Sequence, residues 1–490
     1  MKKLLKIHEK DNVSLAVEPV NKGEKLADIT AKDDIPFGHK IALKDISKGE
    51  SVINFGFSIG NAFNDIKKGE WVHSHNLKSA IEEHGEYTYN HQPAEETEYK
   101  GKMPTFRGYV RENGSIGIRN EIWILPLVGC ANKTAEILCK KANEAYGSLC
   151  DGFYAFTHPY GCSQLGEDHK NTQRILAGLA KHPNACGVLL LSLGCENNNL
   201  ESFLPVLGDC GNNTRTLVLQ GCCDEISEGM KILSELADSA SHQQRTEVTV
   251  DKLVIGFKCG GSDAFSGITA NPLCGRLTDM LTAFGSSAIL TEVPEMFGAE
   301  TALMNRAKDR GVFNAIVSMI NDFKEYFVRH GQVVYENPSP GNKEGGITTL
   351  EEKSVGCIQK GGSASVRDVL EYGEQCIESG LNLLTGPGND IVSCTNLAAS
   401  GAQIILFTTG RGTPLGAPVP TIKIASNSGL ARRKANWIDY NAGEILEEKS
   451  FATAAAELFN LILSIANGGQ TKNEINGYRE IAILKDGVTL

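Results

Sequence analysis

The sequence predicts a multidomain α/β protein, in which a small N-terminal all-β domain precedes two portions with mainly parallel sheets. Two observations lead to this prediction. First, several short apolar runs, rich in β-branched residues, each end at a cluster of Gly, Cys, His or charged residues, which is typical of parallel strands buried under helices. Second, helical patterns at 134–145 and 173–180 alternate with these runs, as in βαβ units. The predicted strands cover residues 122–128, 153–157, 188–193, 253–257, 288–290 and 404–407.

The chain is long enough, at 490 residues, to form two to four domains. Short strand-like pieces separated by Lys-Gly-Glu turns, without a long amphipathic helix, predict an all-β domain over residues 1–90. A polar linker is expected over 91–104, followed by α/β portions over 105–245 and 246–490. The Gly- and Pro-rich stretch 337–346 is expected to be a lid, an active-site loop or a disordered connection.

Composition and charge argue against several classes of partner and of scaffold. The net charge of -11 argues against nucleic acid, which favours basic surfaces. No apolar stretch is long enough to cross a membrane, and the N-terminus lacks the apolar core of a secretion signal, so a cytoplasmic protein is expected. The 14 cysteines are too scattered for a disulfide scaffold in a chain of this size. They contain no CxxC pair, and the adjacent Cys222 and Cys223 do not suit a zinc knuckle.

Reactive side chains follow the predicted strands, and open α/β sheets bind ligands at that edge, so the chain is predicted to be an enzyme. His158 precedes a turn that ends at Cys162, where it could be a base, an acid, a metal ligand or a packed structural residue. Cys195 and Glu196 follow another strand, and Glu196 could simply cap the next helix. The glycine-rich segment 258–263 has neither P-loop nor GxGxxG spacing, which excludes ATP and NAD.

His73, His75 and Asn76 form the sharpest local pattern of the N-terminal domain. In a strand, positions two apart project to the same face, so the two imidazoles could bind one divalent metal, with Asn76 supporting the ligands or contacting substrate. The alternative is a pair of ordinary histidines on a β surface.

Hydroxyls, amides and a guanidinium recur in the C-terminal portion, at Asn396, Thr409 and Arg411 among others. Such a set suits a polyhydroxylated carboxylate, with Arg411 pairing the carboxylate through two hydrogen bonds. Ordinary turn chemistry would explain the same residues equally well.

The order of these motifs resembles the altronate/galactarate dehydratase family over nearly the whole chain. The most specific match is the segment 108–120, whose Arg111 and Arg119 could contact an anion or lie on the surface. The length of the chain is closer to the altronate dehydratases of the family. The other matching motifs are His73-x-His-Asn, His158-Pro-Tyr-Gly-Cys162, Gly194-Cys-Glu196, Lys258-Cys-Gly-Gly-Ser-Asp263, Gly386-Pro-Gly388 and Thr409-Gly-Arg-Gly412.

The resemblance implies a β-clip (SAF-like) first domain and two catalytic α/β portions. It also implies dehydration of a sugar acid, D-altronate to 2-dehydro-3-deoxy-D-gluconate, in hexuronate catabolism. A divalent metal would assist, usually Fe2+, with Mn2+ as a substitute. A metal that holds the substrate carboxylate would stabilise the enediolate-like intermediate formed when the C2 proton leaves.

This hypothesis assigns roles to the residues named above. His73 and His75 would bind the metal, and His158 would be the base or a third ligand. Which of His, Cys, Lys or Glu is the base stays open. The catalytic candidates are His158, Cys130, Cys162, Cys195, Glu196 and Lys258. The substrate-binding candidates are Asn76, Arg119, Asp263, Asn396, Thr409 and Arg411.

Other functions are compatible with the same sequence. Galactarate dehydration and elimination of sulfite from sulfolactate are related chemistries. An iron–sulfur hydro-lyase is a further alternative if Cys130, Cys162, Cys195 and Cys259 converge on one cluster. A non-enzymatic sugar-acid-binding protein would use the β domain for binding instead. A homodimer is the expected assembly.

Overall fold

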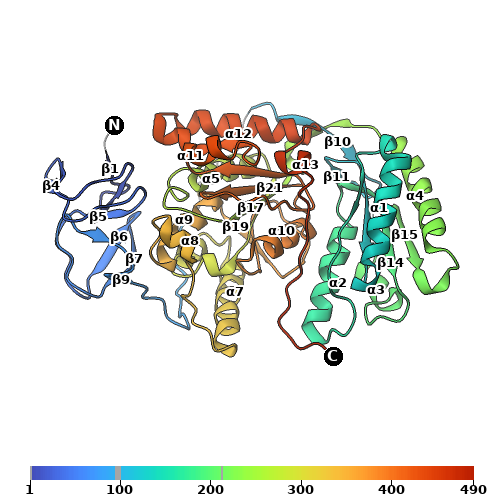
Figure 1. Ribbon diagram of the computed structural model, residues 1–490, viewed down its shortest axis with the longest axis horizontal. Helices are drawn as coiled ribbons and strands as arrows, with labels where there is room; N and C mark the ends of the chain where they lie inside the picture. Colours follow the sequence, from blue (N-terminus) through green and yellow to red (C-terminus); the bar gives the residue numbers. More distant parts are fainter. Residues whose placement is uncertain (1–2, 94–100, 211–212) are drawn as a thin grey trace.

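The computed structural model describes residues 3–93, 101–210 and 213–490. Its three portions lie side by side (Figure 1): the N-terminal β domain at one end, the portion around the largest sheet in the middle, and a smaller α/β portion at the other end. The predicted succession of an all-β domain and α/β portions with parallel sheets is confirmed. The predicted linker at 91–104 falls partly on residues 94–100, outside the described residues.

Short antiparallel strands build the N-terminal domain, in sheets ordered β1-β2-β5-β8, β6-β7-β9 and β3-β4. Its three Lys-Gly-Glu turns place Gly23, Gly49 and Gly69 in the left-handed region, at φ 85°, 89° and 89°, which a side chain would disfavour. The strands are β1 Leu4–Leu5, β2 Val13–Ala16, β3 Lys25–Leu26, β4 Ile29–Thr30, β5 Lys40–Ala42, β6 Ser51–Asn54, β7 Phe57–Ala62, β8 Trp71–Val72 and β9 Leu77–Lys78.

The smaller α/β portion has a parallel four-stranded sheet ordered β13-β12-β14-β15. Successive residues of β12 point to opposite faces, so Ile122 and Ile124 pack with α1 and α4, whereas Trp123 and Leu125 pack with α2. Its strands are β12 Glu121–Pro126, β13 Phe153–Ala155, β14 Ala185–Ser192 and β15 Asn213–Val218. Its helices are α1 Asn132–Tyr146, α2 Gly166–Ala180, α3 Leu200–Leu207 and α4 Glu225–Ser241.

The larger α/β portion has a parallel seven-stranded sheet ordered β19-β20-β18-β17-β21-β22-β23. Helices α5, α7 and α12 cover one face, and α10 covers the other. Its strands are β17 Val254–Cys259, β18 Ser287–Leu290, β19 Val366–Leu370, β20 Gly380–Leu384, β21 Ile404–Thr409, β22 Thr421–Ala425 and β23 Tyr440–Asn441. Its helices are α5 Ala270–Ala283, α6 Glu300–Met304, α7 Arg310–Arg329, α8 Pro340–Glu344, α9 Leu350–Ile358, α10 Asp390–Ala399, α11 Ser428–Arg433, α12 Phe451–Ala466 and α13 Lys472–Ile475.

The two α/β portions are joined by strand pairing and by a shared apolar core. A third small sheet pairs β10 (Thr105–Val110) with β11 (Ile116–Gly117) and with β16 (Thr246–Thr249). One buried apolar cluster contains residues of α2 and α10 together, so the helices that cover the two sheets pack on each other. The two portions therefore form one continuous interior.

The Gly- and Pro-rich stretch 337–346 is not irregular throughout. Ser339 and Asn342 cap each other at the start of the short helix α8, and Pro340 occupies its first turn. The stretch contacts the N-terminal domain, since Gly346 O accepts a hydrogen bond of 2.7 Å from Lys40 Nζ.

Within the described ranges, no helix combines the length and the apolar character needed to cross a membrane.

Candidate functional site

The carboxyl ends of the central strands of the seven-stranded sheet carry buried charged residues. β17 ends at Lys258 and Cys259, and the chain after the neighbouring strand β18 carries Glu292 and Glu295. All four side chains are buried. Glu292 has φ 73°, a left-handed conformation that is uncommon for a non-glycine residue and that tends to occur at functional sites.

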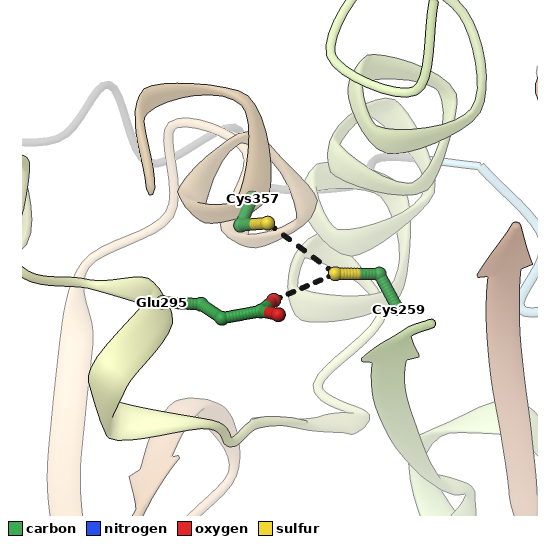
Figure 2. A group of neighbouring side chains, drawn as sticks. All are labelled: Cys259, Glu295 and Cys357. Carbon is green, nitrogen blue, oxygen red and sulfur yellow. Dashed lines mark hydrogen bonds between the residues drawn. The ribbon is translucent and has the colours of Figure 1, made fainter. Parts of the chain in front are cut away.

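Two thiols and a carboxylate meet at this edge. Cys259 Sγ lies 2.8 Å from Glu295 Oε2 and 3.3 Å from Cys357 Sγ. Figure 2 shows the three side chains pointing toward one another from the end of β17, a turn and helix α9. Among the described residues, they are the one group of three potential metal ligands whose donor atoms lie within 4.8 Å of one another. We call Cys259, Glu295 and Cys357 the buried centre.

Lysines set the charge state of the buried centre. Lys360 Nζ lies 3.1 Å from Cys259 Sγ, and Lys353 Nζ lies 2.8 Å from Glu295 Oε1. A hydrogen bond from Cys357, helped by the charges of Lys360 and Lys258, outweighs burial and lowers the pKa of the Cys259 thiol to about 7. Cys259 therefore reaches the thiolate form, which binds metals, at neutral pH.

The donor set fits a divalent transition metal. Two sulfurs and one carboxylate oxygen are ligands that iron or zinc accepts. The thiolate form of Cys259 needs little extra free energy near pH 7, whereas the hydrogen bond to Cys259 raises the pKa of Cys357, whose proton the metal would have to displace. Because the protein supplies three ligands, a fourth position would be left for a water or a substrate oxygen.

Lys258 forms a second charged group beside the buried centre. Its ammonium pairs with Glu292 and with Asp390, the latter at 2.7 Å, and donates to Cys259 O at 2.7 Å. Burial alone would lower its pKa, but the charges of Glu292 and Asp390 hold the pKa of Lys258 well above its ordinary value. Lys258 is therefore a fixed positive charge. The Asp390 side chain is 38% exposed, so this pair connects the buried network to solvent.

A small cavity adjoins the buried centre, with room for about one water molecule. Lys353 and Cys357 line it together with Asp263, whose pKa is raised by burial. The N-terminal domain closes one side, because Phe55 lines the cavity and Lys40 Nζ donates to both carboxylate oxygens of Glu352 at 2.8 Å. The remaining lining residues are Ser262, Ala264, Ser266, Gly267, Asn271, Ile347, Glu352 and Gly356.

The histidines proposed as metal ligands do not lie on a strand, so the premise of alternation was wrong. His73 and His75 lie in the turn between β8 and β9, where Asn76 Oδ1 accepts from His73 N–H at 3.0 Å. His73 is buried, its Nε2 bonds to Lys343 O at 2.9 Å, and its Nδ1 accepts from Ser74 N–H. His75 is exposed. Metal binding by these histidines stays a prediction, while Asn76 holds the turn.

The candidates of the smaller α/β portion lie at the end of a different sheet. Cys130, Cys162 and Cys195 are exposed beyond β12, β13 and β14, whereas Lys258 is buried near the end of β17. The structure therefore distributes them over two sheets and not around one strand edge.

His158 and Glu196 hold the loops at that end. Both His158 nitrogens are engaged, Nε2 with Pro126 O at 2.7 Å and Nδ1 with Tyr160 N–H at 3.2 Å. Burial lowers the pKa of His158 to about 4. The buried Glu196 carboxylate accepts the N–H groups of residues 193 and 194, in addition to the Ser192 hydroxyl. These contacts hold the loops in place, and the catalytic roles of His158 and Glu196 stay predictions.

The substrate-binding candidates are dispersed. Asp263 lines the cavity, whereas Arg119 is buried against Glu474, at 2.8 Å. Asn396 bonds to backbone at Gly373 and Thr385, and Thr409 Oγ1 accepts from Gly412 N–H. Arg411 is exposed and pairs with Glu344 at 2.9 Å.

Sequence patterns did not single out several residues of the site. Lys353 and Cys357 come from α9, and Lys360 from the turn that follows it. Residues 350–357 of this helix are all buried, charged residues included, so it lacks the apolar stripe that marks a surface helix. The Glu292 and Asp390 positions were recognisable only as polar residues after strands.

Comparison with known proteins covers nearly the whole chain. A model of the altronate/galactarate dehydratase SAF domain matches residues 2–80. One of the D-galactarate dehydratase/altronate hydrolase second domain matches residues 108–241, and one of the D-galactarate/altronate dehydratase C-terminal region matches residues 250–489.

Full-length relatives agree with these matches. The chain is 49% identical to an altronate dehydratase of Bacillus subtilis over all of both chains, and 46% identical to an altronate dehydratase of Escherichia coli over 99% of each. It is 31% identical to the galactarate dehydratase (L-threo-forming) of Escherichia coli, over 95% of this chain and 92% of the relative.

Proposed function

The chain belongs to the altronate/galactarate dehydratase family, and from this premise we propose that it is a hydro-lyase acting on D-altronate. The product would be 2-dehydro-3-deoxy-D-gluconate, formed in hexuronate catabolism. The observation that carries the proposal is the 49% and 46% identity to two altronate dehydratases along the entire chain, compared with 31% to the galactarate dehydratase. A cytoplasmic homodimer, with domain boundaries near residues 90, 104 and 245, completes the proposal.

The reaction sets clear chemical demands. The C2 proton of a hydroxy acid is a weak acid, because its removal places a second negative charge beside the carboxylate. Fixed positive charges must stabilise that intermediate, and a second group must protonate the departing 3-hydroxyl.

The buried centre supplies ligands for a divalent metal, which we propose is Fe2+. When bound, such a metal supplies a Lewis acid for an oxygen of the substrate. Cys259, Cys357 and Glu295 would hold it, since their donor atoms already lie within 4.8 Å of one another.

The chain's own residues provide the remaining functions. Lys353 pairs with Glu295 Oε1 at 2.8 Å and so adds a positive charge beside the buried centre. Lys258 stays charged because of Glu292 and Asp390, so it acts as an electrostatic stabiliser and not as a base. Asp390 is the partly exposed carboxylate of the Lys258 group, and we assign proton exchange with solvent to it.

The activity is tested by incubating metal-free protein with D-altronate, with and without Fe2+ under reducing conditions, and measuring a 2-keto-3-deoxy acid. Iron-dependent product is expected. Galactarate and sulfolactate are run in parallel, and turnover of either one in preference to altronate would replace the proposed substrate.

The metal site is tested with Cys259→Ser. We expect iron affinity to fall by at least about tenfold, because a thiolate ligand is lost. Cys186→Ser is the matched control, since Cys186 is also buried but lies in β14. Equal iron affinity in Cys259→Ser and the control would remove the metal from the buried centre.

The site also predicts a pH dependence. Because the pKa of Cys259 is about 7, protons compete with the metal below that pH. The hydrogen bond to Cys259 and burial raise the pKa of Cys357 well above its ordinary value, so its proton must also leave on binding. Metal affinity should therefore rise by about a hundredfold per pH unit below about pH 7 and by about tenfold per pH unit above it, as measured by competition with a chelator. An affinity that is flat across pH 7 would contradict the assignment.

A further inference from the structure

A second set of thiols lies outside the site described above, at the carboxyl edge of the four-stranded sheet. Each of its four strands is followed by a Gly-Cys pair, at residues 129–130, 161–162, 194–195 and 221–222. Cys130, Cys162 and Cys195 are exposed, although free cysteine is one of the most frequently buried residue types. We call Cys130, Cys162 and Cys195 the thiol edge.

The loops that carry the thiol edge are bonded to one another. Gly129 N–H donates to Tyr160 O at 2.8 Å, which joins the loops after β12 and β13. Asn198 N–H donates to Gly161 O at 3.0 Å, and Ser163 N–H donates to Asn197 Oδ1 at 2.8 Å, which join the loops after β13 and β14. The three cysteines are therefore each within three residues of a direct contact between their loops.

The backbone beside these cysteines is fixed in conformations that need glycine. Gly161 has φ 98°, and a Cβ built there would lie 2.0 Å from Leu127 O, so the loop after β13 passes directly over the end of β12. Gly194 has φ 120°, and its N–H is held by the Glu196 carboxylate at 2.6 Å. Cys162 and Cys195 thus stand on rigid, closely packed loops.

The candidate metal ligands at this edge are thiols. His158 lies in the same loop as Cys162, but both of its ring nitrogens are engaged with backbone groups. The Cys195 thiol contacts Gln220 Nε2 at 3.3 Å, and the Cys162 thiol lies 3.7 Å from Ser163 Oγ. Thiolate ligands without imidazole favour iron–sulfur clusters, zinc or copper(I).

A single metal ion would need the three sulfurs of the thiol edge close together. A metal with bonds of about 2.3 Å to sulfur joins sulfurs at most about 4.6 Å apart. In the part of the chain that the structure describes, the buried centre is the group of three donors that meets a 4.8 Å limit, and the thiol edge does not. In a polynuclear cluster the thiolates bind different irons, so their sulfurs need not all lie within that limit.

We infer that Cys130, Cys162 and Cys195 bind a [4Fe–4S] cluster, one iron of which has no protein ligand and is open to an oxygen ligand from solvent. Cys259 is not part of this set, because it lies in the buried centre of the other sheet. The inference concerns a second metal site and does not depend on the proposed dehydration of altronate.

Insertion of the cluster balances as a ligand exchange. A preassembled cluster carries four small-molecule thiolates, and three protein thiols replace three of these. The fourth takes a proton from a water molecule and leaves as a thiol, and the resulting hydroxide stays on the open iron. Each protein thiol loses a proton, and each displaced thiolate takes up one and leaves as a thiol. No electron is transferred.

The test is to incubate the full-length protein anaerobically with a preassembled, thiolate-ligated [4Fe–4S] cluster, to remove unbound cluster by gel filtration, and to measure iron, acid-labile sulfide and visible absorbance. We expect about four sulfides per chain. Acid-labile sulfide separates this cluster from iron bound at the buried centre, which contains none.

Single variants Cys130→Ser, Cys162→Ser and Cys195→Ser should each lower the bound sulfide by at least about fivefold. Cys223→Ser is the matched control, because Cys223 is also exposed and follows β15 at the same edge. Unchanged circular dichroism in the variants shows that the fold is retained. Absence of labile sulfide in the wild-type protein, or full retention in the three variants, overturns the inference.

Binding of a ligand to the iron that has no protein ligand is measured separately. In the reduced protein, addition of glycerate, a small hydroxy acid, should change the electron paramagnetic resonance spectrum of the cluster. An unchanged spectrum would remove the open iron. Altronate turnover is measured separately, so failure of the proposed function and failure of the cluster site give different results.

Discussion

Three buried histidines, His73, His158 and His182, are held in the neutral form, because burial lowers the pKa of each to about 4. In each case Nε2 bonds to a backbone carbonyl, of Lys343, Pro126 and Ala402 respectively. Their imidazoles connect separate segments of the chain.

The neutral histidines predict sensitivity to acid. The folded-state pKa of His158 is about 4, below its ordinary value of 6.5, so the unfolded chain takes up the proton first as the pH falls. The stability from this residue is complete above about pH 6.5 and is lost as the pH falls toward 4, by about 3 kcal/mol. His158→Gln should reduce this pH dependence of the unfolding free energy, measured with urea.

His242→Gln is the control, because His242 is exposed. The same acid dependence in His158→Gln and in the wild-type protein would show that His158 does not carry it.

Part of the site was predictable residue by residue. Lys258 and Asp263 follow an unmistakable apolar strand, and their place at a sheet edge was expected from that alone. Cys357 could not be paired with Cys259 in this way, because 98 positions separate them and α9 gives no local sign of its contact.

At the scale of elements, the buried parallel strands were the most predictable. A strand buried on both faces, such as β14, is a continuous apolar run whatever its neighbours are. The His73 turn was wrongly predicted because β8 is two residues long, too short for an alternating pattern to distinguish a strand from a turn.

Helix α2 offers a test of how the two α/β portions pack. Ala at Gly178 would favour the helix by about 1 kcal/mol, but its Cβ would lie 2.3 Å from Ala399 O, at the end of α10. We expect Gly178→Ala to lower the unfolding free energy by about 1–3 kcal/mol, measured with urea, because the two helices must separate.

The first residue of the same helix provides the comparison. Gly166 has φ 54°, and a methyl group added there would meet nothing within 4 Å, so Gly166→Ala should cost only the backbone strain, about 1–2 kcal/mol. Loss of the α2–α10 contact should appear as faster hydrogen exchange in both helices for Gly178→Ala alone.

At the scale of the whole molecule, the N-terminal domain is connected to the rest through polar contacts that are buried. Lys40 pairs with Glu352 and donates to Gly346 O, and His73 bonds to Lys343 O. The order of the three portions followed from sequence. The contact between the N-terminal domain and the larger α/β portion could not be predicted, because the sequence around a lysine in a short strand does not indicate which carboxylate it pairs with.

Lys40→Met tests this contact. The variant leaves Glu352 buried without its cation, so the unfolding free energy should fall by about 3–5 kcal/mol, measured with urea. The double variant Lys40→Met/Glu352→Leu should recover part of that loss, since no charge is left unpaired.

Lys68→Met is the matched control, because the Lys68–Asp28 pair is exposed and should contribute less than about 1 kcal/mol. Equal effects of Lys40→Met and Lys68→Met would mean that the buried pair does not connect the domains.

The Lys40–Glu352 pair also limits how this protein can be recombined. Its two members are 312 positions apart, so a crossover almost anywhere between them separates the lysine from its carboxylate. A chimaera that takes its first domain from one relative and its body from another would bury an unmatched charge unless both parents carry the pair. The small domain is therefore not a freely interchangeable module, and its inheritance is tied to that of helix α9.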